Sequence, residues 1–193
     1  MDAITLLTTR GSTPWRDLVA PGPDDAEIAE LLATAMATPE HGAIRPWRFI
    51  VISGDSRAAF GEVLAAAILK RKPDTDADTL EKDRVRLRQV PLLIVIAAEI
   101  MENHPKVPPV EQIVSAGMAA QGLLLAAQAR GYGGVILTGD HAYDANVKRA
   151  LGLADKDQIV GFLYIGTGPA DARPKKRPDP ARFTRQWTGP RGA

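Results

Sequence analysis

Four stretches of the chain carry groups that hold anionic ligands in proteins, namely cationic side chains, hydroxyl groups and main-chain N–H groups at the ends of elements. They are Arg10-Gly11-Ser12, TPEHGAIRPWRF (38–49), VILTGD (135–140) and KKRPDP (175–180). Each stretch alone is a weak signal, because ordinary turns and solvated charge runs have similar compositions. The chemistry that they could support is the binding and polarisation of a ligand.

The sequence does not contain the residue patterns that disulfides, metal sites or nucleophilic catalysis require. The chain has no cysteine, so disulfides, thiolate metal sites and a cysteine nucleophile are excluded. His41, His104 and His141 stand alone, without a second histidine at helical spacing, and we predict no metal site. The sequence has no spacing typical of Ser/His/Asp catalysis, no G-x-S-x-G and no Walker lysine motif. We therefore assign no side chain as a catalytic acid, base or nucleophile.

The glycine cluster at residues 131–134, GYGG, lies between a predicted helix and a predicted strand. A phosphate-binding glycine turn has the opposite order, with the strand before the helix, so that the helix N-terminus faces the phosphate. We therefore predict that Gly131 ends the preceding helix as its C-terminal cap.

Helices and strands must position these four stretches, and the two kinds of element alternate along the chain. Helical spacing and caps predict helices at 2–9, 25–37, 57–71, 76–88 and 143–151, besides a long helix described below. Apolar runs rich in β-branched residues predict strands at 47–53, 92–98, 133–138 and 158–167. The first is interpreted as a buried strand, and the second, LLIVIAA, as a central strand covered on both faces. No repeat or linker divides the chain, so we predict one layered α/β domain over residues 1–193, with four core strands and helices on both faces.

The helix predicted from Glu111 to Arg130, EQIVSAGMAAQGLLLAAQAR, is apolar or small on nearly every side. A helix with no polar face is expected to be buried all round. At 1.5 Å per residue it would be about 30 Å long, enough to cross the middle of the protein. We predict a buried spine that two subunits could share.

Composition and charge restrict the class of protein. The chain has 193 residues, of which 45% are hydrophobic and 24% charged, as in soluble globular proteins. The N-terminus is polar too early for a signal peptide, and no apolar stretch reaches the ~20 residues of a membrane span. We expect a cytoplasmic protein without a membrane partner. Residues 171–193 form a basic tail with seven Arg or Lys against two Asp, a net of +5, but the whole chain carries only +1 and lacks a nucleic-acid recognition motif, so no nucleic-acid partner is expected.

Taken in order, the motifs resemble those of the FMN-dependent NAD(P)H nitroreductase family, most closely its short, minimal bacterial branch. The resemblance covers nearly the whole chain. It rests on R-x-S (10–12), P-x-H (39–41), P-W-x-F (46–49), E-x-x-x-S-A-G (111–117), G-x-G-G (131–134) and DKDQIVGFLYIGT (155–167).

The resemblance implies an α+β fold of nitroreductase type, with a central, mostly antiparallel sheet flanked by helices in an intertwined homodimer. It implies two FMN molecules at the subunit interface, NAD(P)H as the electron donor, and a nitroaromatic, quinone or similar small oxidant as the acceptor, reduced by a ping-pong mechanism. The basic tail 171–193 would reach onto the partner subunit. The alternative is a flavin- or ligand-binding protein of the same fold without significant turnover.

The resemblance also implies a set of cofactor-binding residues. They are Arg10, Gly11, Ser12, Pro39, His41, Ile136, Leu137, Thr138, Gly139, Lys176 and Arg177. Arg10 and Ser12 would contact the phosphate or the ring edge, and Pro39 and His41 would form the wall that a partner subunit supplies. Residues 136–139 would pass along the isoalloxazine with main-chain N–H groups toward N5. Lys176 and Arg177 would bind the phosphate; a solvated charge run is the alternative for this pair.

The chain departs from the family pattern where cations are common. Gly11 replaces a second arginine, Pro14 and Trp15 stand where another basic residue is often found, and Leu137 replaces an arginine. Arg16, Lys176 and Arg177 are the candidates to compensate for them. Without compensation, FMN would bind weakly or the fold would serve another ligand.

Overall fold

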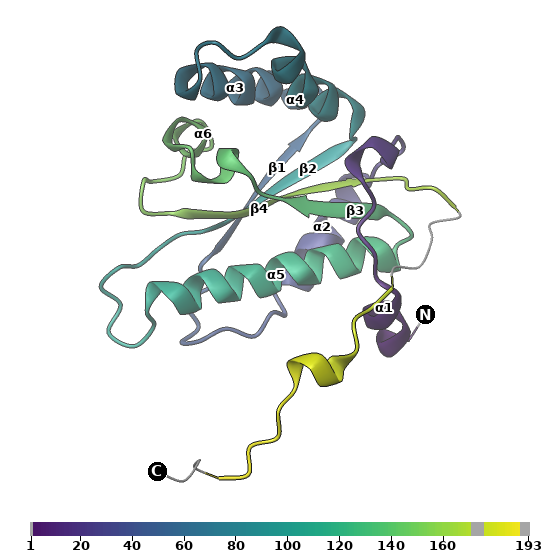
Figure 1. Ribbon diagram of the computed structural model, residues 1–193, viewed down its shortest axis with the longest axis vertical. Coiled ribbons are helices and arrows are strands. Elements are labelled where there is room, and N and C mark those ends of the chain that lie inside the picture. The colour runs from purple at the N-terminus through teal and green to yellow at the C-terminus, as the bar shows by residue number, and fades with distance from the viewer. Residues whose placement is uncertain (1, 171–175, 190–193) are drawn as a thin grey trace.

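The computed structural model describes residues 2–170 and 176–189 (Figure 1). Residues 171–175 and 190–193 of the predicted basic tail lie outside the described residues. The helices are α1 (Ala3–Thr9), α2 (Asp25–Ala35), α3 (Ser56–Arg71), α4 (Ala77–Gln89), α5 (Pro109–Ala129) and α6 (Ala145–Ala150). The strands are β1 (Trp47–Ser53), β2 (Leu92–Ala98), β3 (Gly133–Leu137) and β4 (Gln158–Gly166). Short 3₁₀ turns are η1 (Trp15–Asp17), η2 (Asp140–Tyr143) and η3 (Pro180–Phe183).

The four strands form one sheet in the order β1-β2-β4-β3, and each neighbouring pair is antiparallel. The predicted α+β class with an antiparallel sheet is therefore confirmed. All seven residues of β2 are buried, as expected for a central strand. The register between β2 and β4 shifts between Ile96 and Ala97, where β4 carries a bulge.

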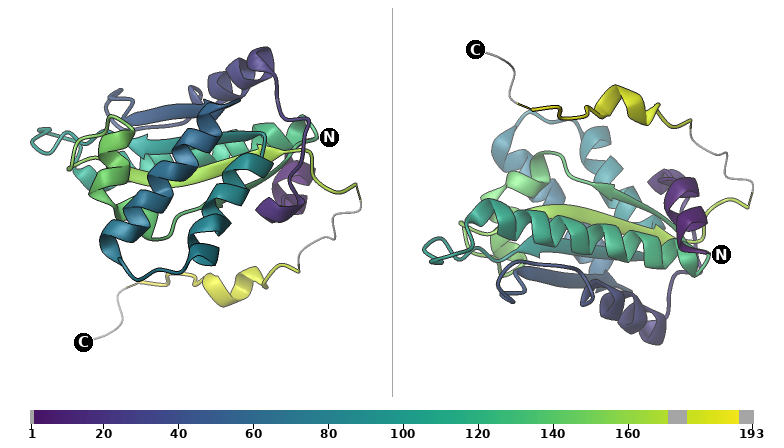
Figure 2. Two further views of the ribbon diagram at one scale, coloured as in Figure 1. Left: turned by 90° about the horizontal axis from the view of Figure 1, so that it is seen from above. Right: turned by 90° about the horizontal axis from the view of Figure 1, so that it is seen from below.

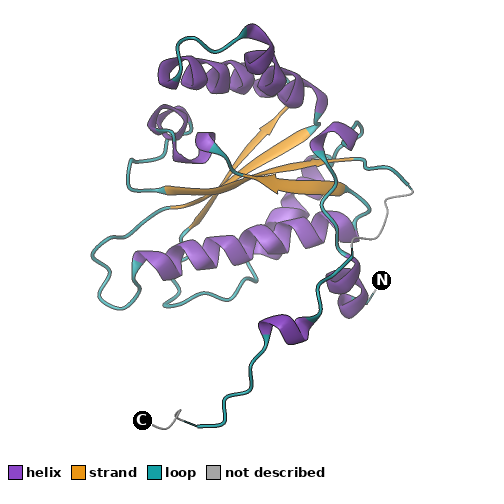
Figure 3. Ribbon diagram, viewed as in Figure 1, coloured by secondary structure: helices purple, strands orange, loops and turns teal. Residues whose placement is uncertain are grey.

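Helices cover both faces of this sheet, as the sequence predicts. On β2, Leu92, Ile94 and Ile96 join the core beneath α2 and α5, whereas Leu93 and Val95 join the core beneath α3, α4 and α6. Figure 2 shows α3, α4 and α6 in front of the sheet from one side and α5 in front of it from the other, and Figure 3 shows the strands between the two helical layers.

β1 differs from the expectation of a buried strand. It lies at the edge of the sheet, and only Trp47 and Ile52 along it are buried, while Val51 is 38% exposed. The run of apolar residues is the same for an edge strand as for a central one, so composition did not reveal its position in the sheet.

Local sequence explains where α2 and α5 begin and end. Asp24 caps α2 by accepting from the Glu27 main-chain N–H at 2.8 Å, and the Glu27 carboxylate accepts from the Asp24 N–H at 3.0 Å, a reciprocal capping box. At the C-terminus of α5, Gly131 has φ +89°, and its N–H and that of Tyr132 donate to the carbonyls of Gln128 and Ala127. Gly131 is thus the helix cap that the sequence predicts.

α5 is not buried all round in a single chain. One face packs on the sheet and α2, with Ala116, Ala119 and Leu123 fully covered. The opposite face leaves Val110 62%, Val114 54% and Met118 39% exposed. Among the described helices, α5 alone has the length and apolar composition of a membrane span, a weak signal that a core helix of a soluble protein also gives. The prediction that α5 is completely buried was therefore wrong for a single chain. The sequence shows which faces of the helix are apolar, but not what covers them.

Candidate functional site

The Arg10-Gly11-Ser12 turn lies half-buried between α1 and η1. The Arg10 guanidinium lies 3.5 Å from the Ser12 hydroxyl, and the Gly11 carbonyl accepts from the Gln128 side chain at 2.5 Å. The Thr13 N–H donates to the Gly134 carbonyl at 3.0 Å, which fixes the turn beside the start of β3. The C-terminal end of α5 and the first residue pair of β3 therefore hold this turn in place.

Arg177 joins this turn from the far end of the chain. Its guanidinium donates to the Arg10 carbonyl, and Lys176 is exposed beside it. The structure thus brings Arg10, Ser12 and Arg177 of the predicted late basic pair to one place, with Lys176 next to Arg177 in the chain. Two guanidinium groups and an ammonium group in one region favour the binding of an anion such as a phosphate.

Residues 136–139 lie where β3 leaves the sheet. Ile136 and Leu137 are half-buried, and Thr138 and Gly139 are exposed. Gly139 has φ +74° and ψ −171°, a region that is essentially restricted to glycine. Thr138 lies four residues along the chain from Gly134, about 13 Å at 3.3 Å per residue. The end of β3 is therefore separated from the Arg10 turn, which is bonded to Gly134, by most of the length of the strand.

Pro39 and His41 lie elsewhere, against the N-terminal end of α5. They line a hollow of about 420 Å³ whose other walls include Val110, Val114 and Met118. His41 Nδ1 lies 2.5 Å from the Glu111 carboxylate, so Nε2 is the ring nitrogen left for solvent or a ligand. Glu40 and Ser115 also line the hollow, but its exposed lining surface is mostly apolar.

The predicted site residues thus form two groups at opposite ends of α5. His41 contacts Glu111 near the first turn of the helix, and the Arg10 turn contacts Gln128 near its last turn. Glu111 and Gln128 are 17 residues apart on α5, about 25 Å along its axis. One chain therefore does not bring Pro39 and His41 to the same ligand as Arg10 and Ser12.

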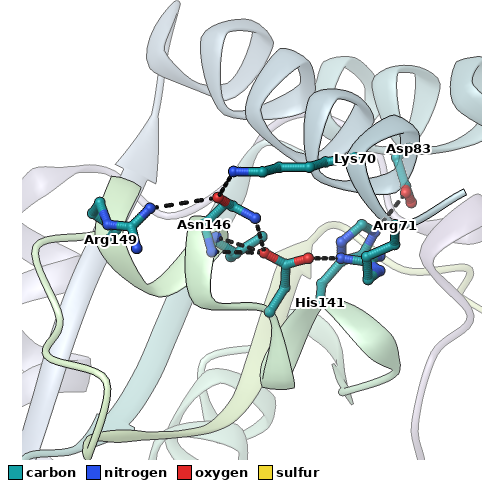
Figure 4. Close-up of polar contacts among 8 residues, drawn as sticks. Lys70, Arg71, Asp83, His141, Asn146 and Arg149 are labelled. Carbon is teal, nitrogen blue, oxygen red and sulfur yellow. Dashed lines mark hydrogen bonds and ion pairs between the residues drawn. The ribbon is translucent and has the colours of Figure 1, made fainter. Parts of the chain in front are cut away.

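A third group of polar residues was missed by sequence reasoning because its members are distant in the chain. Asp83 on α4 is buried and lies 2.8 Å from His141 Nε2 on η2 (Figure 4). It also lies 3.2 Å from the Arg86 guanidinium. Burial raises the pKa of Asp83, but the hydrogen bond from His141 and the charge of Arg86 outweigh it, so the pKa lies below its ordinary value. The lone His141 in the sequence was the only available signal.

Two further cations lie near the Arg10 turn: Arg16, which the sequence offers as a candidate to compensate for the missing cations, and Arg86, which it does not. The Arg16 guanidinium lies 4.5 Å from the centre of the Trp15 ring, and that of Arg86 lies 5.3 Å from the same ring. Positive charge thus stands near the segment where Gly11, Pro14 and Trp15 depart from the family pattern. Within residues 2–170 and 176–189, no group of three His, Asp or Glu side chains is placed to hold a metal ion.

Comparison with known proteins gives a consistent result. Residues 8–167 match the Nitroreductase family. The chain is 37% identical over 184 residues to the Escherichia coli K12 protein described as "Putative NAD(P)H nitroreductase YdjA", covering 95% of this chain and 98% of that protein.

Solved structures show the same fold. The Nitroreductase-like Family Protein from Bacillus cereus has a TM-score of 0.80 at 22% identity, covering 98% of this chain and 97% of that one. The FMN and NADPH-dependent nitroreductase NfnB from sphigopyxis sp. strain HMH has a TM-score of 0.76 at 20% identity, covering 98% of this chain and 100% of that one.

Proposed function

The chain belongs to the nitroreductase family, and from this premise we propose that it is an FMN-dependent oxidoreductase that acts as a homodimer. NAD(P)H is the proposed electron donor, and a nitroaromatic, quinone or similar small oxidant is the proposed acceptor. The FMN and NADPH-dependent nitroreductase NfnB has the same fold over 98% of this chain and 100% of its own length.

The separation of the two groups of site residues along α5 is the observation that carries this proposal. The uncovered face of α5, with Val110, Val114 and Met118, adjoins the hollow that contains His41. A second copy packed on this face in a two-fold arrangement would cover these apolar side chains. It would also carry its own 39–41 loop toward the Arg10 turn of the first copy, so that a ligand is enclosed by both chains.

The residues present suit a flavin mononucleotide. Arg10, Lys176 and Arg177 would hold the phosphate by charge-assisted hydrogen bonds, with the Ser12 hydroxyl as a further donor. The main-chain N–H groups of residues 136–139 would lie along the ring and donate toward its N5 edge. Pro39 and His41 would close the ring's environment from the second copy and exclude water.

When bound, FMN would supply the redox chemistry, as an acceptor of a hydride from NAD(P)H and a source of electrons for the oxidant. The protein's residues bind, orient and polarise. No side chain is assigned as an acid or base, so protons would come from water. Because donor and acceptor occupy one face in turn, initial-rate lines for NADPH and a nitroaromatic should be parallel, and intersecting lines would contradict a shared face.

Purification of the full chain tests the cofactor and the activity separately. We expect a yellow dimer that releases FMN on denaturation, identified by mass spectrometry, and whose flavin absorbance is bleached by NADPH or NADH. A yellow protein that neither nucleotide bleaches would support the alternative, a flavin-binding protein without turnover, which the absent cations at positions 11 and 137 favour. Colourless, monomeric protein that takes up no added FMN would exclude a flavoprotein of either kind and leave only the binding of another ligand.

A further inference from the structure

α4 contacts both segments that flank the proposed cofactor site, through residues on one of its faces. Asp83 binds the His141 ring of η2, which follows Gly139 directly. Arg86, one turn along, binds Asp83 and places its guanidinium over the rings of Trp15 and Tyr164 at 5.3 and 5.7 Å. Trp15 belongs to the segment that follows Ser12.

A further residue of α4 holds the same N-terminal segment. The Gln89 amide donates to the carbonyl of Arg16 at 2.7 Å and lies 3.3 Å from that of Leu18. Three side chains from one helix thus fix the segments after Ser12 and after Gly139, which are far apart in the sequence. Asp83 links the two segments, because it binds His141 directly and also binds Arg86, which lies over Trp15.

The neighbouring contacts of this layer show a different pattern. Arg71 pairs with Asp144, and Lys70 donates to Asn146 at 2.8 Å, so these residues fasten α3 to α6 (Figure 4). Arg84 pairs with Glu62 at 2.7 Å and fastens α4 to α3. None of these three contacts reaches residues 10–18 or 136–141.

The Asp83 cluster leaves two of its buried polar atoms without a partner among the described residues. In the part of the chain that the structure describes, the buried Nδ1 of His141 and the buried Nε of Arg86 have no hydrogen-bond partner. A buried polar atom without a partner is unfavourable, and a buried ion pair is often no more stabilising than apolar side chains of similar volume. The contacts of Asp83 and Arg86 fix the positions of η2 and of the segment after Ser12 relative to α4.

We propose that Asp83 is a positioning residue of the proposed redox site, which acts through His141 on the Gly139 turn and through Arg86 on the segment after Ser12. The inference rests on the proposed function. Because main-chain N–H groups cannot be aimed by a rotamer change, their direction depends on how the turn itself is anchored. Release of His141 would let the turn rotate about Gly139 and weaken the hydrogen bond toward flavin N5.

Substitutions at His141 test this role. In His141→Leu the bond to Asp83 is lost, whereas in His141→Gln the side-chain amide can still donate from nearly the same position. With ¹⁵N-labelled FMN, we expect the N5 resonance of the leucine variant to move toward that of flavin without a hydrogen bond. The rate of flavin reduction by NADPH should fall about tenfold, because a small misplacement of the reacting groups slows a reaction strongly. The glutamine variant should return the N5 resonance to near its wild-type position and the reduction rate to within about twofold of the wild type.

Matched controls separate this role from stability. Arg84→Gln removes an ion pair one residue away on the same helix and should leave the N5 resonance and the reduction rate unchanged. Asp83→Asn keeps the side-chain volume and should shift the resonance in the same direction as His141→Leu, which provides a second test where the leucine variant does not fold. A wild-type resonance and rate in folded His141→Leu and Asp83→Asn would overturn the inference, while wild-type protein that binds no FMN would instead defeat the proposed function on which it rests.

Discussion

Gly139 is the residue at which backbone conformation and proposed chemistry coincide. Its φ of +74° with ψ of −171° is a conformation that other residues adopt only with strain of about 1–3 kcal/mol. Among the described residues, no atom lies within 4 Å of the position that a Cβ would take there, so any penalty would come from the backbone alone. We expect Gly139→Ala to lower the free energy of unfolding by about that amount in urea titrations and to weaken FMN binding by fluorescence titration.

Gly152 provides the control for this substitution. It also has a positive φ, +73°, with open space where a Cβ would stand, but it follows α6 and lies outside the predicted site. Gly152→Ala should therefore destabilise the fold while leaving FMN affinity as in the wild type. Equal losses of FMN affinity in both variants would show that residue 139 has no particular place in the site.

Tyr132 gives a pH-dependent prediction at the residue scale. Its hydroxyl donates to the Glu27 carboxylate at 2.7 Å, and this hydrogen bond, with burial and the nearby negative charge, raises its pKa to about 12. The folded state holds the proton more tightly than the unfolded chain, so the stabilisation is complete below pH 10 and is lost as the pH rises toward 12.

Absorbance titration of the phenolate measures this effect, as the difference between the wild type and Tyr132→Phe. Glu27→Gln should bring the Tyr132 pKa back toward its ordinary value of 10, because an amide holds the phenol proton less strongly than a carboxylate. An unchanged pKa in that variant would mean that the hydrogen bond does not form in solution.

Sequence identifies single site residues only where they belong to a recognisable short motif. Arg10, Ser12 and Arg177 were proposed from such motifs, and the structure gathers them at one turn, although whether they bind FMN stays a prediction. Asp83 and His141 belong to no motif and are 58 residues apart. Their contact depends on the packing of α4 against η2, which local patterns do not encode.

At the scale of elements, periodicity and caps predicted nearly every helix and strand, since each pattern is local. β1 and α5 are the elements whose surroundings were misjudged, because the partners of an apolar surface are set by topology. α5 is apolar on nearly every side, which predicted its complete burial. Because one apolar face is exposed in the single chain, we infer that a second copy covers this face.

A substitution on that face tests what covers it. Met118 on α5 is 39% exposed in the single chain, and Met118→Glu would place a charge in the proposed interface. Burial of an unpaired charge is strongly unfavourable, so sedimentation velocity should show a shift from dimer to monomer, with loss of bound FMN. Val85→Glu is the matched control, because Val85 on α4 is also 39% exposed but lies on the other side of the sheet. Dissociation in both variants, or in neither, would contradict the α5 interface.

For the whole molecule, the C-terminal segment is the part whose position a single chain does not explain. Figure 1 shows it running away from the body beyond α5, and η3 has no buried residue. Phe183 and Trp187 are 75% and 74% exposed on it. Because these large aromatic side chains are exposed in the single chain, we infer that they pack on the surface of a second copy. The resemblance to the family implies the same position for the tail.

Truncation after residue 179 tests that role of the tail. Burying a large apolar side chain contributes about 1.5–3 kcal/mol, so removal of both aromatic residues should raise the dimer dissociation constant by at least about tenfold, measured by sedimentation at several protein concentrations. The truncation leaves Lys176 and Arg177 in place, and therefore separates dimerisation from phosphate binding. Full-length chain with Phe183 and Trp187 both changed to alanine should reproduce the loss, whereas Arg182→Gln with Arg185→Gln should not, because exposed charges contribute little to such contacts. A truncated chain that stays dimeric at every concentration would place the tail outside the interface and leave the α5 face to hold the dimer alone.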